Sequence, residues 1–261
     1  MNLPKLFLVI IVFATSCSHE NVTPGKSTNT KLISEEFLFY NPTNTASSDG
    51  FVGSFKKVYK YEQNRLVQID AYDFNISTNS YDEGYPLEEF HYDSANRLSQ
   101  RIEFVGSLGL RWIEAFEYLN SNNIKVTRYE SNGVIQNISD WWVMERTSSS
   151  LTVKYYQLGG DLYTELNCEI NEKGNITRMV RNPSFAGGAI YYKYDDSPNP
   201  NNYPELSGGE DLNAYKFFSP NNAIEITSDI NTKSTVSIQY NNQGYPNEIT
   251  TSTTKRILHY Q

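Results

Sequence analysis

A short pattern of alternating side chains around a turn recurs along the chain, and it constrains the fold more than any other feature. In EFHYDSANRLSQRIEF, residues 89–104, Phe90 and Tyr92 alternate with polar neighbours before the turn, and Leu98 and Ile102 do so after it. Successive side chains of a β-strand point to opposite faces, so each flank can bury one face. The residues DSAN between the flanks favour a tight turn. The stretch is therefore predicted to form a β-hairpin.

Four further stretches repeat this plan more loosely and at irregular spacing. Each ends its first strand on two apolar residues separated by one position, and a turn follows directly. Such turns need a positive φ or local side-chain bonding, which we expect Gly174, Gly244, Asn96 and Asn123 to provide. Hairpins that follow one another make an antiparallel meander. The four stretches are VYKYEQNRLVQI at 58–69, AFEYLNSNNIKV at 115–126, LNCEINEKGNITRM at 166–179 and SIQYNNQGYPNEIT at 237–250.

The residues between the apolar positions decide what surrounds this sheet. They are polar, whereas a transmembrane barrel needs an apolar band at such positions. The other face carries many of the 20 tyrosines and 13 phenylalanines, which bury about 150 to 250 Å² each. We therefore predict a mainly β fold, an antiparallel up-and-down meander of hairpins that forms a curved sheet or a soluble barrel. The polar positions are Lys60, His91, Glu117, Lys193 and Gln239.

One segment interrupts the pattern near residues 198–222. Pro198, Pro200 and Pro204 cannot donate hydrogen bonds to a strand ladder, so the chain has to leave the sheet here. We expect a short helical or loop insert, with residues 205–218 as the candidate helix. It would act either as a lid on the barrel or as a crossover to the next strand.

The N-terminal sequence MNLPKLFLVIIVFATSC is typical of a signal peptide, with Lys5 followed by nine apolar residues. An apolar stretch of this length is too short to cross a membrane, which needs about 20 residues. The residues ATSC that end at Cys17 resemble a bacterial lipobox, which implies cleavage before Cys17 and attachment of diacylglycerol to its sulfur. The alternative is an ordinary secreted protein with a chance cysteine near its cleavage site.

These features divide the chain into three parts. Residues 1–16 are the predicted lipoprotein signal peptide. Residues 17–33 are polar and without apolar periodicity, so they are expected to be a flexible tether after the lipidated cysteine. Residues 34–261 are predicted to form a single antiparallel β domain.

Two resemblances follow from the hairpin sequences. YKYEQNRL and FHYDSANRL resemble degenerate YD repeats. The succession YYKYDDSPNPNNYP, FFSPNNAIEIT and IQYNNQGYPNEIT resembles the C-terminal half of a family of Gram-negative lipoproteins of unknown function with a porin-like fold. The resemblance implies an up-and-down β architecture and a location in the cell envelope. It brings no catalytic residues with it.

Composition and motifs exclude several kinds of chemistry. The chain has 30 acidic and 22 basic residues, so we expect no nucleic-acid partner. None of the three histidines has a second ligand at metal-site spacing, and we predict no metal and no cofactor. The loop after Asp195 offers oxygen ligands but lacks the residue order of a calcium loop. Cys168 is expected to be a small buried apolar side chain.

Three residues of the β domain remain as site candidates. Trp141 and Trp142 are adjacent, so in a strand they point to opposite faces and one of them lies outside the core. An exposed ring could stack on a sugar or peptide, with Trp142 the first to test. The alternative, which we favour, is a ring half covered by a neighbouring strand or the insert. Ser94, in Asp93-Ser94-Ala95, resembles an acceptor of bacterial O-glycosylation on a predicted turn.

These observations favour a membrane-anchored envelope lipoprotein that acts as a non-catalytic binding or scaffolding module for a protein or glycan. A second hypothesis is a glycan hydrolase with two carboxylates in the barrel mouth, roughly 5 to 9 Å apart. A third is a purely structural envelope protein. The predicted location is the outer membrane, with the β domain facing the periplasm or the cell exterior.

Overall fold

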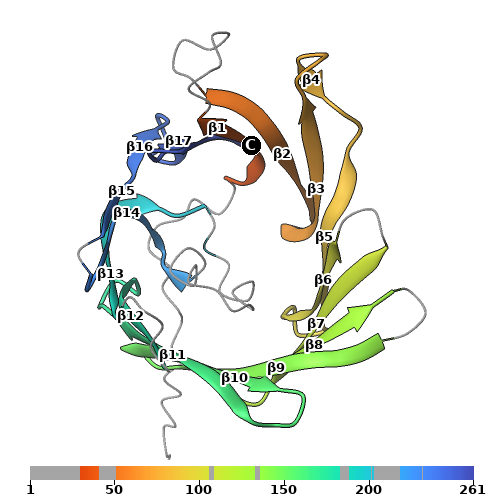
Figure 1. The fold of residues 1–261 in the computed structure, drawn as a ribbon, viewed down its shortest axis with the longest axis vertical. Helices are drawn as coiled ribbons and strands as arrows, with labels where there is room; N and C mark the ends of the chain where they lie inside the picture. Colours follow the sequence, from red (N-terminus) through yellow and green to blue (C-terminus); the bar gives the residue numbers. More distant parts are fainter. Residues whose placement is uncertain are drawn as a thin grey trace, which may run out of the picture.

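The chain folds into one antiparallel sheet that curls into a nearly closed barrel. The computed structural model describes residues 30–40, 51–105, 109–132, 136–182, 188–200, 202, 218–230 and 232–261. Eighteen strands lie within these ranges, and the labels β1 to β17 follow one another around the ring in Figure 1. β1 pairs with β18 as well as with β2, which joins the first and last strands. The strands are β1 (Leu32–Tyr40), β2 (Phe51–Glu62), β3 (Arg65–Asn75), β4 (Ser80–Tyr81), β5 (Tyr85–Tyr92), β6 (Leu98–Val105), β7 (Leu110–Tyr118), β8 (Asn123–Ser131), β9 (Gln136–Arg146), β10 (Ser150–Gln157), β11 (Leu162–Ile170), β12 (Ile176–Asn182), β13 (Ile190–Pro198), β14 (Asn221–Ser228), β15 (Lys233–Thr235), β16 (Ser237–Tyr240), β17 (Pro246–Thr250) and β18 (Thr254–Tyr260).

This topology confirms the predicted meander and selects the barrel over an open curved sheet. Each main strand pairs antiparallel with its neighbour in the chain, while the short β4 extends the hairpin of β3. β15 pairs with β14 and β16 with β17, so these two short strands continue one another on either side of Val236. β1 begins at Leu32, two residues before the expected start of the domain, and Leu32 is buried.

The predicted insert lies between β13 and β14. Its two described ends meet, because Pro198 pairs with Asn221 and the Asn199 N–H donates to the Pro220 carbonyl. The helix expected at residues 205–218 falls outside the described residues apart from its last position. No helix within the described ranges has the length and apolar character needed to cross a membrane.

The five predicted hairpin turns and the turn 147–149 gather at one end of the barrel, which we call the turn rim. It comprises the turns 63–64, 93–97, 119–122, 147–149, 171–175 and 241–245. Residues Lys31 and Gln261 also lie at this end, where each backbone N–H donates to the carbonyl of the other at 3.1 and 3.0 Å. The opposite end, which we call the loop rim, carries the connections 76–84, 158–161 and 251–253. The N-terminal segment therefore enters the barrel at the turn rim.

Three of the four residues predicted to provide the hairpin turns do so. Gly174, Gly244 and Asn96 have φ values of 83°, 80° and 67°, a region that glycine and asparagine tolerate best. The prediction for Asn123 is wrong, because this residue already begins β8. Its turn is held instead by the Asn120 side chain, whose Oδ1 accepts from the N–H groups of Asn122 and Asn123 at 2.8 and 2.9 Å.

A repeated tyrosine contact explains why the hairpin sequence recurs. A tyrosine near the end of one strand, or in the middle of β13 for Tyr194, donates its hydroxyl to the carbonyl of the first or second residue of the main strand before it. A basic side chain lies over three of these rings. Each such tyrosine therefore fastens one hairpin to the one before it, and Tyr61 and Tyr92 are each followed by a turn, an arginine and a leucine. The donor and acceptor pairs are Tyr61–Leu32 (3.0 Å), Tyr92–Leu66 (2.8 Å), Tyr118–Leu98 (3.0 Å), Tyr194–Ile176 (2.6 Å) and Tyr260–Pro246 (2.7 Å), and the overlying cations are Lys31, Arg65 and Arg97.

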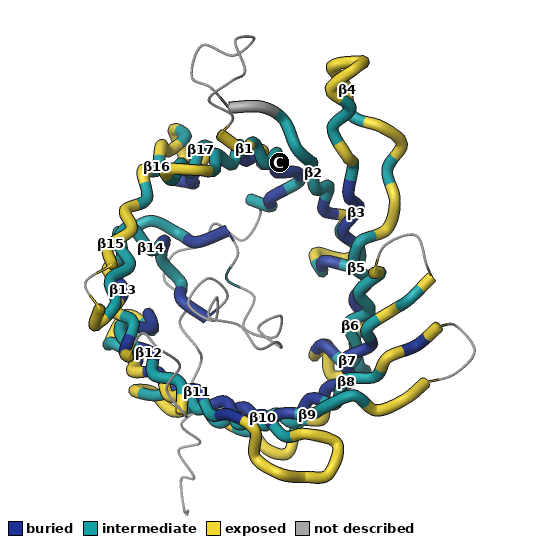
Figure 2. Tube along the Cα trace, in the orientation of Figure 1, coloured by how far each residue is buried: buried dark blue, intermediate teal, exposed yellow. Residues whose placement is uncertain are grey.

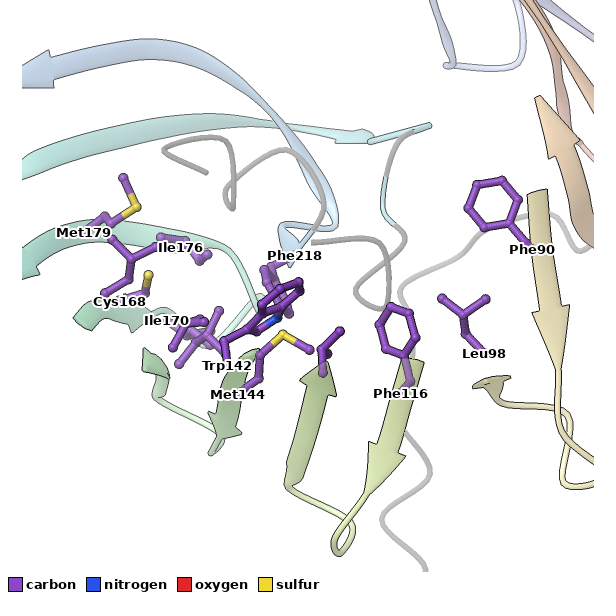
Figure 3. Packing of buried hydrophobic residues seen from close by; sticks show 14 of the residues in the cluster. Phe90, Leu98, Phe116, Trp142, Met144, Cys168, Ile170, Ile176, Met179 and Phe218 are labelled. Carbon is purple, nitrogen blue, oxygen red and sulfur yellow. The ribbon is translucent and has the colours of Figure 1, made fainter. Parts of the chain in front are cut away.

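The core lies on the inward face of the sheet. Phe116, Val126, Trp142 and Tyr155 are paired in succession across β7 to β10, so they share one face. Figure 3 shows Phe90, Phe116 and Trp142 projecting from their strands toward the interior of the ring. Their exposed fractions range from 0 to 8%, and they belong to one cluster that runs around the barrel. These side chains are therefore shielded from water.

The outward face is polar, as predicted. Lys60, His91, Glu117, Lys193 and Gln239 are all exposed. Exposed residues in Figure 2 also gather on the hairpins that extend from the ring, whereas buried residues line it. Charged side chains at these outward positions do not form the apolar band that lipid would require.

Candidate functional site

A row of charged side chains lines the inward face from β6 to β9. Arg101, Glu114, Arg128 and Asp140 are paired in succession, so their side chains share the face that carries the core. Glu114 contacts Arg101 and Arg128 at 3.2 Å each, and Arg128 contacts Asp140 at 3.6 Å. Glu88 on β5 continues the row through a 2.8 Å contact with Arg101. We call these five residues the ionic wall.

The ionic wall is largely removed from water. The Glu114 side chain is 3% exposed, and burial raises its pKa because the contacts with Arg101 and Arg128 offset this effect only in part. Burial would lower the pKa of Arg101, but Glu88 and Glu114 outweigh it and raise that pKa. Glu88, Glu114 and Asp140 each contact an arginine. These ion pairs lie on the same face of the sheet as the apolar core. Each carboxylate of the wall contacts an arginine, so the wall does not present two unpaired carboxylates that face one another across a gap.

A second cluster of inward polar side chains joins the first two strands of the sheet to the last strand. Glu35 on β1 is 2% exposed and contacts Arg256 on β18, while the Tyr59 hydroxyl on β2 donates to Glu35 at 2.6 Å. Burial would raise the pKa of Glu35, but Arg256, Lys57 and the Tyr59 hydrogen bond together lower it. The cluster therefore favours an ionised Glu35 at the closure between β18, β1 and β2.

The two adjacent tryptophans lie on opposite faces of β9, but not in the sense expected. Trp142, the ring chosen first as exposed, is 1% exposed and lies in the core, so that choice is wrong. Trp141 lies outside and stacks on Tyr156 with ring centroids 3.9 Å apart, and the Lys125 ammonium lies 5.3 Å from its centroid. Tyr156 and Lys125 come from the strands on either side of β9. The Trp141 ring is therefore partly covered by side chains of its two neighbouring strands, as in the alternative that we favoured, and the residue keeps intermediate exposure.

The remaining sequence candidates are placed as follows. Ser94 is exposed on the turn 93–97, whose Asp93 carboxylate accepts from the Arg97 N–H at 2.8 Å. Cys168 is buried at 4% exposure, as expected, and burial raises its pKa to about 12. Cys17 lies outside the described residues. Within those residues, no three His, Cys, Asp or Glu side chains come together in a group that could hold a metal ion.

The ionic wall was not predicted from the sequence, although the sequence contains a signal for it. Arg101, Glu114, Arg128 and Asp140 recur in four successive strands of a meander, with alternating charge. Only the strand register shows that they are neighbours.

Comparison with solved structures identifies the type of fold. No family model matches the chain, and no curated protein matches it. A porin-like protein from Bacteroides uniformis ATCC 8492 is similar in structure, with a TM-score of 0.50 and 10% sequence identity over 88% of this chain and 96% of that one. A porin-like protein from Bacteroides vulgatus ATCC 8482 has a TM-score of 0.36 and 10% identity over 89% and 99%. The first comparison shows that the chain has a porin-like barrel fold.

Proposed function

We propose that this chain is an envelope lipoprotein, held at the outer membrane by a lipid on Cys17, and that its barrel is a non-catalytic binding or scaffolding module. The observation that carries the proposal is the charged outward face of a porin-like barrel. Together with the lipobox-like sequence at Cys17, it supports anchoring through the N-terminus and a barrel wall that faces water.

One row of outward side chains shows why the barrel wall is expected to face water. Glu117, Lys125, Lys154 and Glu165 lie on the same face of β7 to β11, with Val143 completing the row between the two lysines. A lysine on the lipid face of a barrel costs about 2 to 4 kcal/mol at the bilayer midplane. Such a row is stable in water without any compensation, so these charges support a wall outside the hydrocarbon core.

The position of Lys31 at the turn rim gives the proposed orientation. About 14 residues separate it from Cys17, and a chain extends by at most about 3.3 to 3.6 Å per residue. A lipid on Cys17 would hold the turn rim within roughly 50 Å of the membrane surface. The loop rim and the outer wall around Trp141 would remain accessible to a protein or glycan ligand, with Ser94 on the membrane-facing rim as a proposed site of glycosylation.

Protease treatment of intact cells tests the location. Digestion of the β domain on intact cells would place it outside, and digestion only after permeabilisation of the outer membrane would place it in the periplasm. Either result supports an envelope protein. Protection that persists after permeabilisation, with recovery in the cytosolic fraction, would contradict the proposal.

Alanine substitution at Trp141 tests the proposed binding surface. We expect ligands identified with a glycan array or by crosslinking on cells to bind Trp141→Ala at least fivefold more weakly than the wild type. Unchanged binding of every detected ligand would reject this surface. Thr152→Ala on the same outward wall is a matched control that should leave binding unchanged.

A further inference from the structure

Two neighbouring rows of side chains on the outer wall of the barrel are mainly apolar. They alternate along their strands with the residues of the ionic wall, so they lie on the face that points away from the interior. Ile138 and Leu162 are 46% and 53% exposed. The first row is Ile102, Ile113, Tyr129 and Ile138 on β6 to β9, and the second row, nearer the turn rim, is Ala115, Thr127, Trp141, Tyr156 and Leu162 on β7 to β11. We call these nine residues the apolar face.

Charges of opposite sign border the apolar face along β7. Arg111 lies on its loop-rim side and Glu117 on its turn-rim side, each three residues from Glu114. Both are exposed, and both lie on the outward face because β7 pairs with β8 without a register shift. Among the described residues, neither has an ion-pair partner, and Arg111 lies over the Phe104 ring at 5.0 Å from its centroid. The two charges are therefore available to a partner.

A second copy of the chain matches this pattern. Two copies that pack face to face around a twofold axis present the same residues to each other. If the axis crosses β7 at the level of Glu114, residues at equal distances on either side of it face one another. Arg111 of each copy then faces Glu117 of the second copy, and the row that contains Ile113 faces the row that contains Trp141. Two ion pairs would form, and the apolar rows would cover one another.

The opposite arrangement, with the two barrels parallel, is disfavoured by charge. Lys125, Lys154, Glu117 and Glu165 are placed symmetrically about Val143 in one outward row. A twofold axis along β9 would therefore bring lysine opposite lysine and glutamate opposite glutamate. Like charges that face each other across an interface weaken it. The charge pattern favours antiparallel barrels.

The area of the apolar face indicates a weak dimer. Strands β7 to β11 lie about 4.8 Å apart and residues 111–117 extend over about 23 Å, so the contact covers at most roughly 500 to 600 Å² on each copy. A standard stable interface buries about 800 Å² on each partner. Two chains anchored in one membrane have a high effective concentration, which favours a weak contact.

We propose that the apolar face docks a second copy of this chain, with the two barrels antiparallel and side by side. The inference rests on the proposed function and names the protein ligand of the wall around Trp141. The tether allows this geometry, because it reaches about 50 Å whereas the nine residues of β7 extend over about 30 Å. Lipids on both copies can therefore enter the same membrane although the two turn rims point in opposite directions.

Co-isolation of two tagged copies tests the dimer. Full-length chains with different C-terminal tags are produced together in a bacterium that lipidates them. Intact cells are treated with a membrane-permeant, amine-reactive crosslinker, and the chains are isolated by one tag. We expect the second tag in a crosslinked band of twice the chain mass. Absence of this band would overturn the proposal.

Charge reversal locates the contact. Arg111→Glu and Glu117→Arg should each lower the yield of the dimer by about fivefold or more, because each places like charges opposite one another. A chain with both substitutions should recover the yield, since the pairs form again with reversed sign, and this recovery would also show that the losses do not come from misfolding. Glu62→Arg, at an exposed position of β2, is the matched control and should leave the yield unchanged. Single reversals without effect, or a double variant without recovery, would overturn the proposal.

The result can be separated from that of the proposed function. If no dimer forms but Trp141→Ala still weakens the binding of another ligand, the binding surface stands and the dimer is rejected. If the chain is recovered outside the envelope, the proposed function fails whether or not a dimer forms.

Discussion

The Glu35 cluster provides the sharpest test of how the barrel closes. Replacing Glu35 by glutamine keeps the side-chain shape and one acceptor for the Tyr59 hydroxyl, but it removes the charge that faces Arg256. The Glu35 side chain is 3% exposed and that of Arg256 is 18% exposed, so solvent screens this pair little. The substitution therefore tests the charge interaction itself.

The expected loss at pH 7 is about 3 kcal/mol. Hydrogen bonds to charged groups contribute about 1.5 to 3 kcal/mol, and breaking a buried ion pair costs about 3 to 5 kcal/mol. Glutamine retains part of the hydrogen bonding, which places the estimate at the low end of the second range. For a domain of this size, that loss lowers the melting temperature by about 6 to 12 °C.

The effect should depend on pH in a defined direction. Arg256, Lys57 and Tyr59 outweigh the effect of burial, so the pKa of folded Glu35 lies below its ordinary value of 4.5. A carboxyl with a lowered folded pKa stabilises the protein fully above its unfolded pKa, and this contribution is lost as the pH falls through the folded pKa. The difference between the wild type and Glu35→Gln should therefore shrink below about pH 4.5.

Urea unfolding followed by tryptophan fluorescence between pH 7 and pH 3 measures this difference. Glu36→Gln is the matched control, because Glu36 lies next to Glu35 and contacts His259 at 3.5 Å with 28% of its side chain exposed. We expect it to change the free energy of unfolding by less than about 1 kcal/mol. A loss below 1 kcal/mol for Glu35→Gln, or a loss that stays constant with pH, would refute the reasoning.

Three further predictions concern the inward face and the tyrosine contacts. Tyr92→Phe should lower the free energy of unfolding by about 1 kcal/mol, measured in urea, because it removes the hydrogen bond to Leu66 and keeps the ring; no loss would contradict this role. Trp142→Ala should cost about 3 to 5 kcal/mol and Trp141→Ala about 1 kcal/mol, and equal losses in urea would contradict the assignment of faces. Cys168, with its pKa raised to about 12, should react with iodoacetamide at pH 8 only after unfolding, and rapid labelling of the native protein would disprove its burial.

The hairpins could be predicted because their signals are local. Phe90, Tyr92 and Leu98 show both the alternation of the strands and the position of the turn within ten residues. The tyrosine contacts between hairpins could not be predicted in the same way. Tyr92 donates to a backbone carbonyl 26 positions earlier, and a carbonyl acceptor leaves no trace in the sequence.

The contacts between inward charges could not be predicted, because they depend on barrel closure and on the strand register. Glu35 and Arg256 are 221 positions apart and meet only because the barrel closes. The ionic wall likewise requires the register of four strand pairs. For the tryptophans, alternation established that they lie on opposite faces but left open which one is buried. The N-terminal prediction around Cys17 rests on sequence alone and stays a prediction.

Fractionation of a chain with a changed leader tests the central claim, which is that the protein is held at a membrane by a lipid on Cys17 and not by its barrel wall. Residues 1–17 are replaced by an ordinary cleavable secretory signal, and the native chain is fractionated in parallel. The account predicts that the native chain requires detergent for extraction, whereas the altered chain is recovered folded in the soluble envelope fraction. An altered chain that stays in the membrane and still requires detergent would contradict the account.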